Sequence, residues 1–511
     1  MTLQRDSVDG VEVFFTESGR DVLSASLIFR VGWSDETLVT AGVTHLIEHL
    51  LLHGEPPGAL RVNGSTASQL TSLDVSGAPD DVVAYLQVVC RRVSEFPFGD
   101  MNHERRVLAA ERAERGVSAM GRALAVRFGV TGLGLAGWSD FAIENLRPES
   151  VSPWLERYFT AGNAVLTLDG PIPTGLRLPL PSGPRRPTVP PVARPFTFPT
   201  AHEGYRGVVI ATGKVPDGPA VTLAGNVWRR RVRQALLGRV IGPRSQVTLA
   251  SEFAGPEQIL GIIVHVGDKG ARETLEAIRT SLDDLAGVGP TDRELADEVT
   301  RVRLGATSAD YNKAEPWLVA RRSLAGLTAR DGEATVAEFS AVAPSDVAAV
   351  CRQVQDTLLV QVPPGTDRSG QGDLTWTPIH DPAPDTPSRT YRLKGPSRWV
   401  DRETPVIRLG ATTVSHQTPA ESFTLSLPHV AAALVRRDGG TTLVSADGDT
   451  LRIEPSLWES GATLVAQVKN RLPESVVLIR ESISAVNLPQ PITWKQWYAR
   501  RVRSWIRRPT E

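Results

Sequence analysis

Two histidines and a glutamate are spaced so that they could hold a metal ion and use it. The segment His45-Leu46-Ile47-Glu48-His49 reads H-x-x-E-H. If it is helical, the histidines at i and i+4 project from one face, where both imidazoles can bind a single Zn²⁺ ion. Glu48 lies beside them and could act as a general base toward water. The spacing therefore predicts a catalytic zinc site whose base is Glu48.

A catalytic zinc site usually takes three protein ligands and leaves one position open. The candidates for the third ligand lie in a charged segment, residues 100–114, that is predicted to be a helix. Glu104 and Glu111 are seven residues apart and share a face with apolar residues, where an unpaired carboxylate is costly to bury. From spacing alone, a solvent-exposed charged helix explains this segment equally well.

His53 is a rival for the third ligand because it follows His49 by four residues. It lies eight residues from His45, or about 12 Å along a helix axis, which is beyond the reach of one shared metal ion. We therefore expect a half-exposed histidine at the helix end, and not a ligand.

Alternating apolar residues predict the elements that position this site. Residues 11–32 predict two strands before the helix, and a strand pair is predicted near 62–77. Strands near 207–212 and 258–266, with helices near 222–238 and 270–285, loosely repeat this order. The second set contains only His202 and His265, and neither has a neighbour at ligand spacing. The metal chemistry is therefore assigned to the first set.

The ends of the two sets resemble each other. Val151-Ser152-Pro153 is predicted to open an amphipathic helix that leads into a strand after Asn163. Val342-Ala343-Pro344 is predicted to open another, which leads into a strand after Asp356. Each strand ends at a Gly/Pro boundary, which indicates a duplicated α+β domain.

The fold class predicted from these patterns is α+β, with two repeated domains and a small β-rich domain after them. Two Pro-rich stretches cannot hold helices and read as linkers. The predicted division is a zinc-binding domain at 1–170, a linker at 171–199, a degenerate repeat at 200–363, a linker at 364–400, a β-rich domain at 401–490 and a basic aromatic helix at 491–511.

The last two segments carry no cluster that suggests chemistry. Short alternating strands broken by Gly-rich turns make the β-rich domain weakly similar to pleckstrin-homology-like modules. The final helix combines Trp494, Trp497 and Trp505 with basic residues. This composition is typical of a contact with a membrane surface or an acidic partner. The alternative is a helix that docks its tryptophans on the protein's own surface.

Composition excludes several classes of protein. The formal net charge is −1 over 511 residues, so no global field favours nucleic acid. Only two cysteines occur, which excludes a disulfide framework and a cysteine-based metal site. The N-terminus lacks the pattern of a signal peptide, and we expect a cytoplasmic protein.

Taken in order, several short motifs over residues 11–170 resemble the pitrilysin/insulinase metallopeptidases, whose zinc signature is the inverzincin H-x-x-E-H. The matching residues are Val31, Gly32, Glu36, Gly42, His45, Glu48, His49, Asn63, Gly64, Thr66, Thr71, Glu104, Glu111, Gly137, Tyr158 and Asn163. The resemblance implies that His45, His49 and Glu111 bind Zn²⁺ and that Glu48 is the base. It also implies that Glu104 orients a histidine ligand.

The resemblance extends to substrate binding. It implies that the strand with Asn63, Gly64 and Thr66 is an edge strand to which a substrate peptide adds as a further strand. Family members often hold the substrate with an Arg and a Tyr from the second repeat. This sequence has Arg239 as the candidate Arg and Ser245 at the Tyr position. Arg239 could equally be a surface charge in a basic run.

Two functions follow as hypotheses. The first is a zinc metalloendopeptidase that cleaves peptides or unfolded segments, with processing of a precursor peptide as one such role. The second is a non-catalytic scaffold or substrate-presenting subunit of a peptidase heterodimer. The intact zinc motif favours the first. The family's chamber has four repeated domains and this chain shows two, so we expect a dimer, with a related zinc-less subunit favoured over a homodimer.

Overall fold

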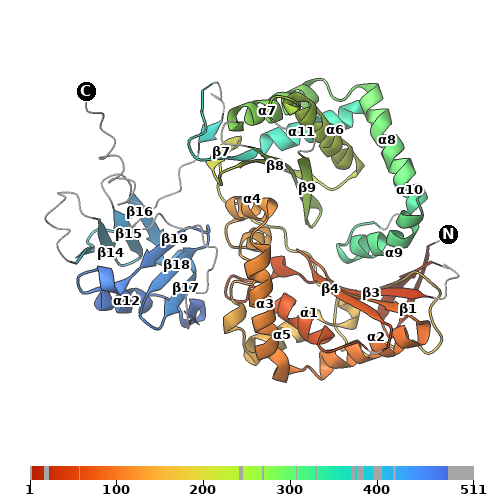
Figure 1. The fold of residues 1–511 in the computed structure, drawn as a ribbon, viewed down its shortest axis with the longest axis horizontal. Helices are drawn as coiled ribbons and strands as arrows, with labels where there is room; N and C mark the ends of the chain where they lie inside the picture. Colours follow the sequence, from red (N-terminus) through yellow and green to blue (C-terminus); the bar gives the residue numbers. More distant parts are fainter. Residues whose placement is uncertain are drawn as a thin grey trace. The chain divides into compact units, whose positions relative to one another are not determined.

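The computed structural model describes residues 3–16, 22–56, 58–240, 246–266, 270–306, 308–328, 331–369, 374–376, 385–394, 405–417 and 422–480. The chain forms two compact units (Figure 1). The first comprises Met1–Arg112 and Val117–Ile379, and the second comprises Ala113–Gly116 and His380–Glu511. Both contain helices and strands, so the predicted α+β class is confirmed.

The first sheet of the larger unit has six strands in the order β1-β2-β6-β3-β5-β4. Their bounds are Gln4–Val8 (β1), Val11–Phe15 (β2), Leu23–Phe29 (β3), Arg61–Thr66 (β4), Thr71–Gly77 (β5) and Ala164–Leu168 (β6). β2 and β6 are parallel, and the other pairs are antiparallel. β4 is therefore an edge strand, as the family resemblance implied.

The second sheet has the order β12-β7-β11-β8-β10-β9, in which the five strands from β7 to β9 repeat the arrangement of the first sheet. Its strands are Thr200–Glu203 (β7), Val208–Pro216 (β8), Val247–Ala254 (β9), Glu257–His265 (β10), Leu359–Val362 (β11) and Thr375–Trp376 (β12). β7 pairs in parallel with β11, as β2 does with β6, and the next three pairings are antiparallel in both sheets. The shared order from β2 to β4 and from β7 to β9 confirms the predicted duplication.

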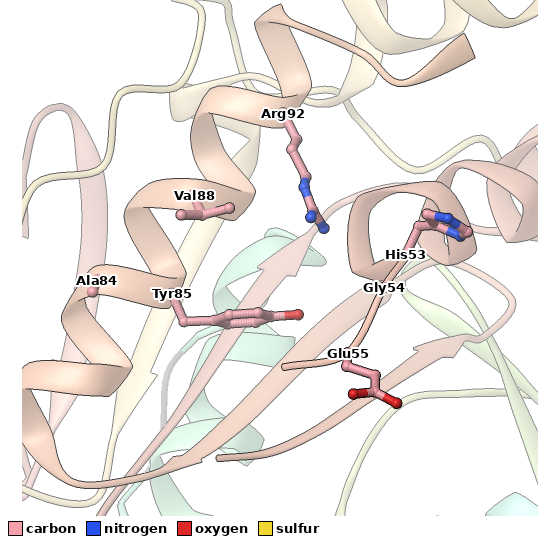
Figure 2. A pocket seen from close by; sticks show the side chains of 7 residues that line it. All are labelled: His53, Gly54, Glu55, Ala84, Tyr85, Val88 and Arg92. Carbon is pink, nitrogen blue, oxygen red and sulfur yellow. The ribbon is translucent and has the colours of Figure 1, made fainter. Parts of the chain in front are cut away.

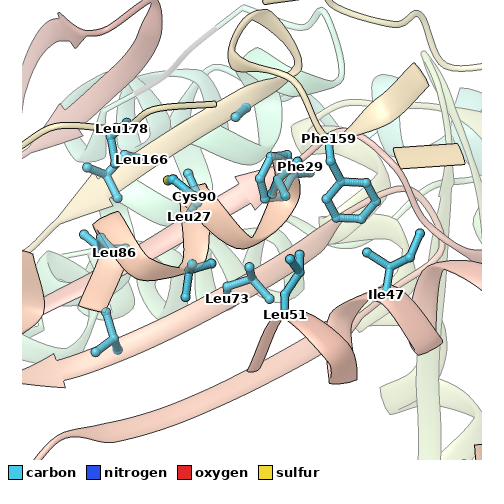
Figure 3. Close-up of a cluster of buried hydrophobic side chains, with 14 of the residues drawn as sticks. Leu27, Phe29, Ile47, Leu51, Leu73, Leu86, Cys90, Phe159, Leu166 and Leu178 are labelled. Atoms are coloured by element: carbon cyan, nitrogen blue, oxygen red, sulfur yellow. The ribbon is translucent and has the colours of Figure 1, made fainter. Parts of the chain in front are cut away.

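Five helices accompany the first sheet: Val43–Leu52 (α1), Pro79–Ser94 (α2), Met101–Arg115 (α3), Ala119–Phe128 (α4) and Pro148–Tyr158 (α5). The core lies between this sheet and helices α1 and α2 (Figure 3). Ile47 and Leu51 of α1 are fully buried there, in the same cluster as Leu27 and Phe29 of β3. Burial of each such side chain contributes about 1.5–3 kcal/mol, which fixes the rotation of α1 and hence the direction of its histidines.

Helix α5 begins earlier than predicted. Its first residue is Pro148, and Pro153, which was expected to open the helix, lies inside it. Proline fits the first helical position because the amide that it lacks has no partner there. Pro148 therefore fits the first position of α5. Pro153 has no N–H group, so the helix lacks one backbone hydrogen bond at that residue.

The second sheet is accompanied by Pro219–Leu236 (α6), Ala271–Gly287 (α7), Asp292–Ala306 (α8), Ala309–Leu324 (α9), Gly332–Ser340 (α10) and Pro344–Asp356 (α11). Each repeat also packs one of its helices on the sheet of the other repeat. Val319 and Leu324 of α9 pack on Ile28 and Val165 of the first sheet, while Ala123 of α4 packs on the second sheet. The larger unit is thus held together by buried apolar contacts in both directions.

The smaller unit is β-rich, as predicted. One sheet contains Arg389–Arg392 (β13), Val406–Leu409 (β14), Thr413–Gln417 (β15) and Ser422–Ser426 (β16), and the other has the order β19-β18-β17-β20. The latter strands are Val430–Arg436 (β17), Thr441–Ser445 (β18), Thr450–Ile453 (β19) and Val477–Arg480 (β20), with helix Gly461–Lys469 (α12) before the last. The predicted basic helix at 491–511 lies outside the described residues.

Among the described helices, no single one has the length and apolar composition to cross a membrane. Helices α10 and α11 meet that criterion only as a pair, and they are bent by 89° at their junction.

Candidate metal centre

The start of helix α1 is stabilised by the buried carboxyl group of Glu36. Glu36 accepts hydrogen bonds from the backbone amides of Gly42 and Thr44, each at 2.8 Å. These amides lie at the start of the helix, where backbone N–H groups have no hydrogen-bond acceptor within the helix. Burial raises the pKa of Glu36 to about 8, and the two backbone hydrogen bonds oppose that rise. Glu36 thus fixes the beginning of the helix that carries the histidines.

His45, His49 and Glu111 come together from α1 and α3. One candidate ligand atom from each lies within 4.8 Å of the other two. Nε2 of His49 is 3.7 Å from Oε1 of Glu111, and Nε2 of His45 is 4.0 Å from Oε2. Ligands of a tetrahedral zinc site are roughly 3.4 Å apart, given bonds of about 2.0–2.1 Å. The donor types and their spacing therefore fit a zinc ion after a small contraction.

The other nitrogen of each histidine is held by a carboxylate. Nδ1 of His45 donates to Asp140 at 3.0 Å, and Nδ1 of His49 donates to Glu104 at 3.0 Å. An ionised carboxylate only accepts, so each Nδ1 carries the proton and each Nε2 presents a lone pair. This arrangement is typical of histidines that ligate zinc. Glu104 thus has the position that the resemblance implied.

Asp140 was not identified from the sequence. It lies 95 residues from His45, in a turn after α4 where its φ is 54°. An Asp with positive φ is uncommon, but that conformation is not visible in the sequence. The Gly-Trp-Ser-Asp run after Ala136 is typical of a turn and contains no spacing that relates it to His45.

His53 does not join the cluster. Its Nδ1 donates to Oε1 of Glu104 at 2.6 Å, and its Nε2 lies 3.7 Å from Asp100. Glu104 therefore binds His49 through one oxygen and His53 through the other. The third histidine of α1 supports the carboxylate that orients a candidate ligand.

Glu48 lies beside the cluster. Its Oε2 is 4.0 Å from Nε2 of His45 and accepts a hydrogen bond from the Thr66 hydroxyl at 3.1 Å. Burial raises the pKa of Glu48, and the neighbouring histidines and the Thr66 hydrogen bond oppose that rise. A raised pKa suits a group that takes and returns a proton near neutral pH.

Strand β4 brings the predicted substrate-binding residues to the same place. Asn63, Gly64 and Thr66 lie on this edge strand, opposite Asp74, Leu73 and Thr71 of β5. At Gly64 a Cβ atom would come closer than 3.0 Å to the Glu48 carboxylate. Glycine therefore allows the edge strand to lie directly against the candidate base.

Among the described residues, Arg239 makes no contact with the residues of the cluster. It is exposed in the turn after α6, where its amide bonds the Leu236 carbonyl at 3.1 Å. Ser245, at the position of the family's Tyr, lies outside the described residues.

Comparison with solved structures shows which known fold the chain has. No family model and no curated protein sequence matches the chain. Among solved structures, the peptidase M16 inactive domain from Pseudomonas fluorescens is 14% identical with a TM-score of 0.59, over 71% of this chain and 98% of that one. A protease from Helicobacter pylori is 16% identical with a TM-score of 0.58, over 71% and 99% respectively.

The periplasmic protease PqqL from Escherichia coli adds a comparison of size. Its first half is 14% identical to this chain with a TM-score of 0.55, over 70% of this chain and 91% of that half. Against the whole PqqL chain, the match covers 83% of this chain and only 55% of PqqL. At such identities the likeness is one of fold. The chain has the fold of M16 peptidase domains, both active and inactive, and chemistry must be argued from its own residues.

Proposed function

We propose that this protein is a zinc-dependent endopeptidase that cleaves peptides or unfolded segments. The observation that carries the proposal is the cluster of His45, His49 and Glu111, with both Nδ1 atoms held by carboxylates and a buried glutamate beside it. A structural histidine pair has no need of this whole arrangement. The donor set fits zinc, and the neighbouring carboxylate fits a proton acceptor.

The residues divide the work as follows. His45, His49 and Glu111 would hold the metal, and Asp140 and Glu104 would keep the imidazoles in the binding tautomer. Zinc, when bound, supplies Lewis-acid activation of water and of the scissile carbonyl. Glu48 accepts the proton of the attacking water and returns it to the leaving amine. Thr66 holds Oε2 of Glu48 in place.

Edge strand β4 supports the choice of a peptide as substrate. Its outer backbone groups can pair with an extended peptide, which would be added to the sheet as a further strand. This mode needs a substrate without its own secondary structure, so peptides and unfolded segments are favoured. Gly64 and Thr66 would lie beside the bond to be cleaved, because both lie against Glu48, and Asn63 would bind the substrate next to them along the strand. Maturation of a precursor peptide is the physiological role that we propose.

A non-catalytic subunit is the second candidate. One similar structure is an inactive M16 domain, and another belongs to the complex III2 of Candida albicans. Arg239 has no contact with the cluster in the described residues, which also favours a scaffold. The complete donor set favours the enzyme.

The test is metal content and peptide cleavage measured on the same samples. The wild-type chain should bind one zinc and cleave a peptide library or casein. Glu48→Gln should retain zinc and lose cleavage, whereas His45→Ala, His49→Ala and Glu111→Gln should each lose zinc. Zinc-loaded wild-type protein that cleaves no peptide, alone or with a partner subunit, would support the scaffold. Full zinc in Glu111→Gln would move the third ligand to Glu104, His53 or Glu114.

A further inference from the structure

A cavity of about 230 Å³ lies between helix α2 and the segment that follows α1 (Figure 2). Ala84, Tyr85, Val88 and Arg92 line it from α2. These residues recur at helical spacing and form one stripe of that helix. The opposite wall includes His53 and Glu55. The cavity is smaller than the roughly 300–1,000 Å³ typical of sites for drug-sized ligands, so it suits a small molecule.

Tyr85 presents an unpaired hydroxyl to this cavity. Only 6% of the residue is exposed, and no other described residue makes a hydrogen bond to its hydroxyl. Figure 2 shows the phenol pointing from α2 into the space before Glu55. Burial raises the pKa of Tyr85, so the hydroxyl keeps its proton and can donate. The hydroxyl oxygen itself is open to the cavity and not enclosed by protein, so it can donate to a ligand there.

Arg92 places a positive charge beside that hydroxyl. Its Nη1 donates to the Leu51 carbonyl at 2.8 Å, which anchors the guanidinium to the last turn of α1. In Figure 2 the guanidinium points toward the same space as the Tyr85 hydroxyl. A guanidinium has five donors, so others remain for a ligand. An anchored guanidinium and a phenol together suit a carboxylate.

The remaining walls restrict what carries the carboxylate. Ala84 and Val88 offer an apolar surface for a short aliphatic group. Glu55 is exposed at the rim, where its negative charge disfavours a dianion such as phosphate and favours an ammonium group. We propose that this cavity binds a free α-amino acid with a small aliphatic side chain. Its carboxylate meets Tyr85 and Arg92, and its ammonium group faces Glu55.

The cavity is distinct from the candidate metal centre. His53 is the lining residue that connects them, through its hydrogen bond to Glu104. Because amino acids also chelate zinc, the two sites must be separated in any binding measurement. The proposal does not depend on the peptidase activity.

Isothermal titration calorimetry of the full-length chain tests the proposal, with L-leucine, 4-methylpentanoate and 3-methylbutylamine as probes. Leucine should bind one to one. The carboxylate without the amine should bind more weakly, and the amine without the carboxylate should give no signal. Leucine binding should survive removal of metal by a chelator, because none of His45, His49 and Glu111 lines the cavity.

Two variants and a control locate the site. Tyr85→Phe keeps the ring and removes one donor, so the Kd for leucine should rise about tenfold. Arg92→Met should abolish binding, whereas Arg91→Met, at an exposed neighbour, should leave it unchanged. Absence of leucine binding to the wild-type chain would overturn the proposal. Wild-type affinity in both cavity variants, or loss of binding on chelation, would overturn it as well.

Discussion

Asp140 holds Nδ1 of His45 at 3.0 Å from across the fold. The turn that carries Asp140 is itself fixed, because its carbonyl accepts a hydrogen bond from Arg112 of α3 at 2.9 Å. The start of α1 lies directly against this turn: a Cβ on Gly42 would be only 3.0 Å from the Cα of Asp140. Gly42 also has a φ of 103°, which favours glycine. Three separate segments thus determine the orientation of one imidazole.

We expect Asp140→Asn to weaken zinc binding about 10–100-fold, because the amide no longer stabilises the protonated Nδ1 of His45 as a carboxylate does. Asn tolerates the positive φ at this position, so the fold should be retained. Competition with a chelator of known affinity measures the effect. Ser139→Ala, a change at the exposed neighbouring residue, is the control. Equal zinc affinity in Asp140→Asn and wild type would refute the orienting role.

The sequence predicted the residues of the metal centre better than the geometry that holds them. His45 and His49 were predictable because helical spacing places i and i+4 on one face. Glu104 and Glu111 were left open by their spacing and were assigned only through the family resemblance. Asp140 could not be found, since its contact depends on a turn 95 residues away. Local periodicity carries no information about such long-range contacts.

The same limit applies to the fold. Strands flanked by turn residues and helices with clear starts were predicted close to their observed bounds, as at Pro344 of α11. Eight described strands were not predicted: β1, β7, β9, β12, β13, β15, β18 and β20. The exchange of α4 and α9 between the two repeats was also not predictable, because the pattern of each helix shows that it has an apolar face but not which sheet covers that face.

Gly64→Ala should impair catalysis without removing the metal. The added methyl group would occupy the space of the Glu48 carboxylate and approach Leu52 of α1, so either the base or strand β4 must move. A displacement of about 1 Å in a catalytic group can cost about 100-fold in rate. We expect kcat/KM for a peptide to fall by at least tenfold at unchanged zinc content. Ser65→Ala, at the next and exposed residue, should behave as wild type, and an unimpaired Gly64→Ala would show that the close approach is unimportant.

Glu36 should make the stability of the larger unit depend on pH. Its folded-state pKa of about 8 lies above the ordinary value of 4.5, because burial disfavours the charged form. The folded state therefore keeps a proton that the unfolded state releases between these values. The contribution of Glu36 to stability is fully present below pH 4.5 and is lost as the pH rises toward 8, by at most about 1.4 kcal/mol per pH unit.

Glu36→Gln should remove this component, since glutamine does not titrate. Urea unfolding of metal-free protein at several pH values between 4.5 and 8 measures it. The free energy of unfolding of the wild type, relative to that of the variant, should decline over this interval. Glu55→Gln, at an exposed position, should leave the pH profile unchanged. A constant difference between wild type and Glu36→Gln would show that Glu36 is already ionised at pH 4.5.

The number of repeated sheets in the chain indicates how many chains the active form needs. The larger unit contains two sheets of the repeated topology, and the match to PqqL covers 55% of that protease. The chain therefore matches about half of that protease, and the chamber of four repeated domains that the family resemblance implies would need a second chain. Edge strand β4 can take up a peptide, but no described contact brings a second-repeat cation to the cluster. A partner could close the site and contact the substrate from the opposite side, so that the transition state is held by both subunits.

We therefore expect the active form to be a dimer, with a related subunit that lacks the zinc motif favoured over a second copy of this chain. Such a subunit would provide the Arg and Tyr that the described residues of this chain do not bring to the cluster, so its addition should raise kcat/KM by at least tenfold. Light scattering gives the mass of the assembly, and peptide cleavage with and without the partner gives its effect. Partner variants lacking those two side chains should still assemble yet fail to stimulate cleavage. Full activity from a chain that remains monomeric at the assay concentration would contradict this expectation, because a single chain would then suffice to hold the substrate.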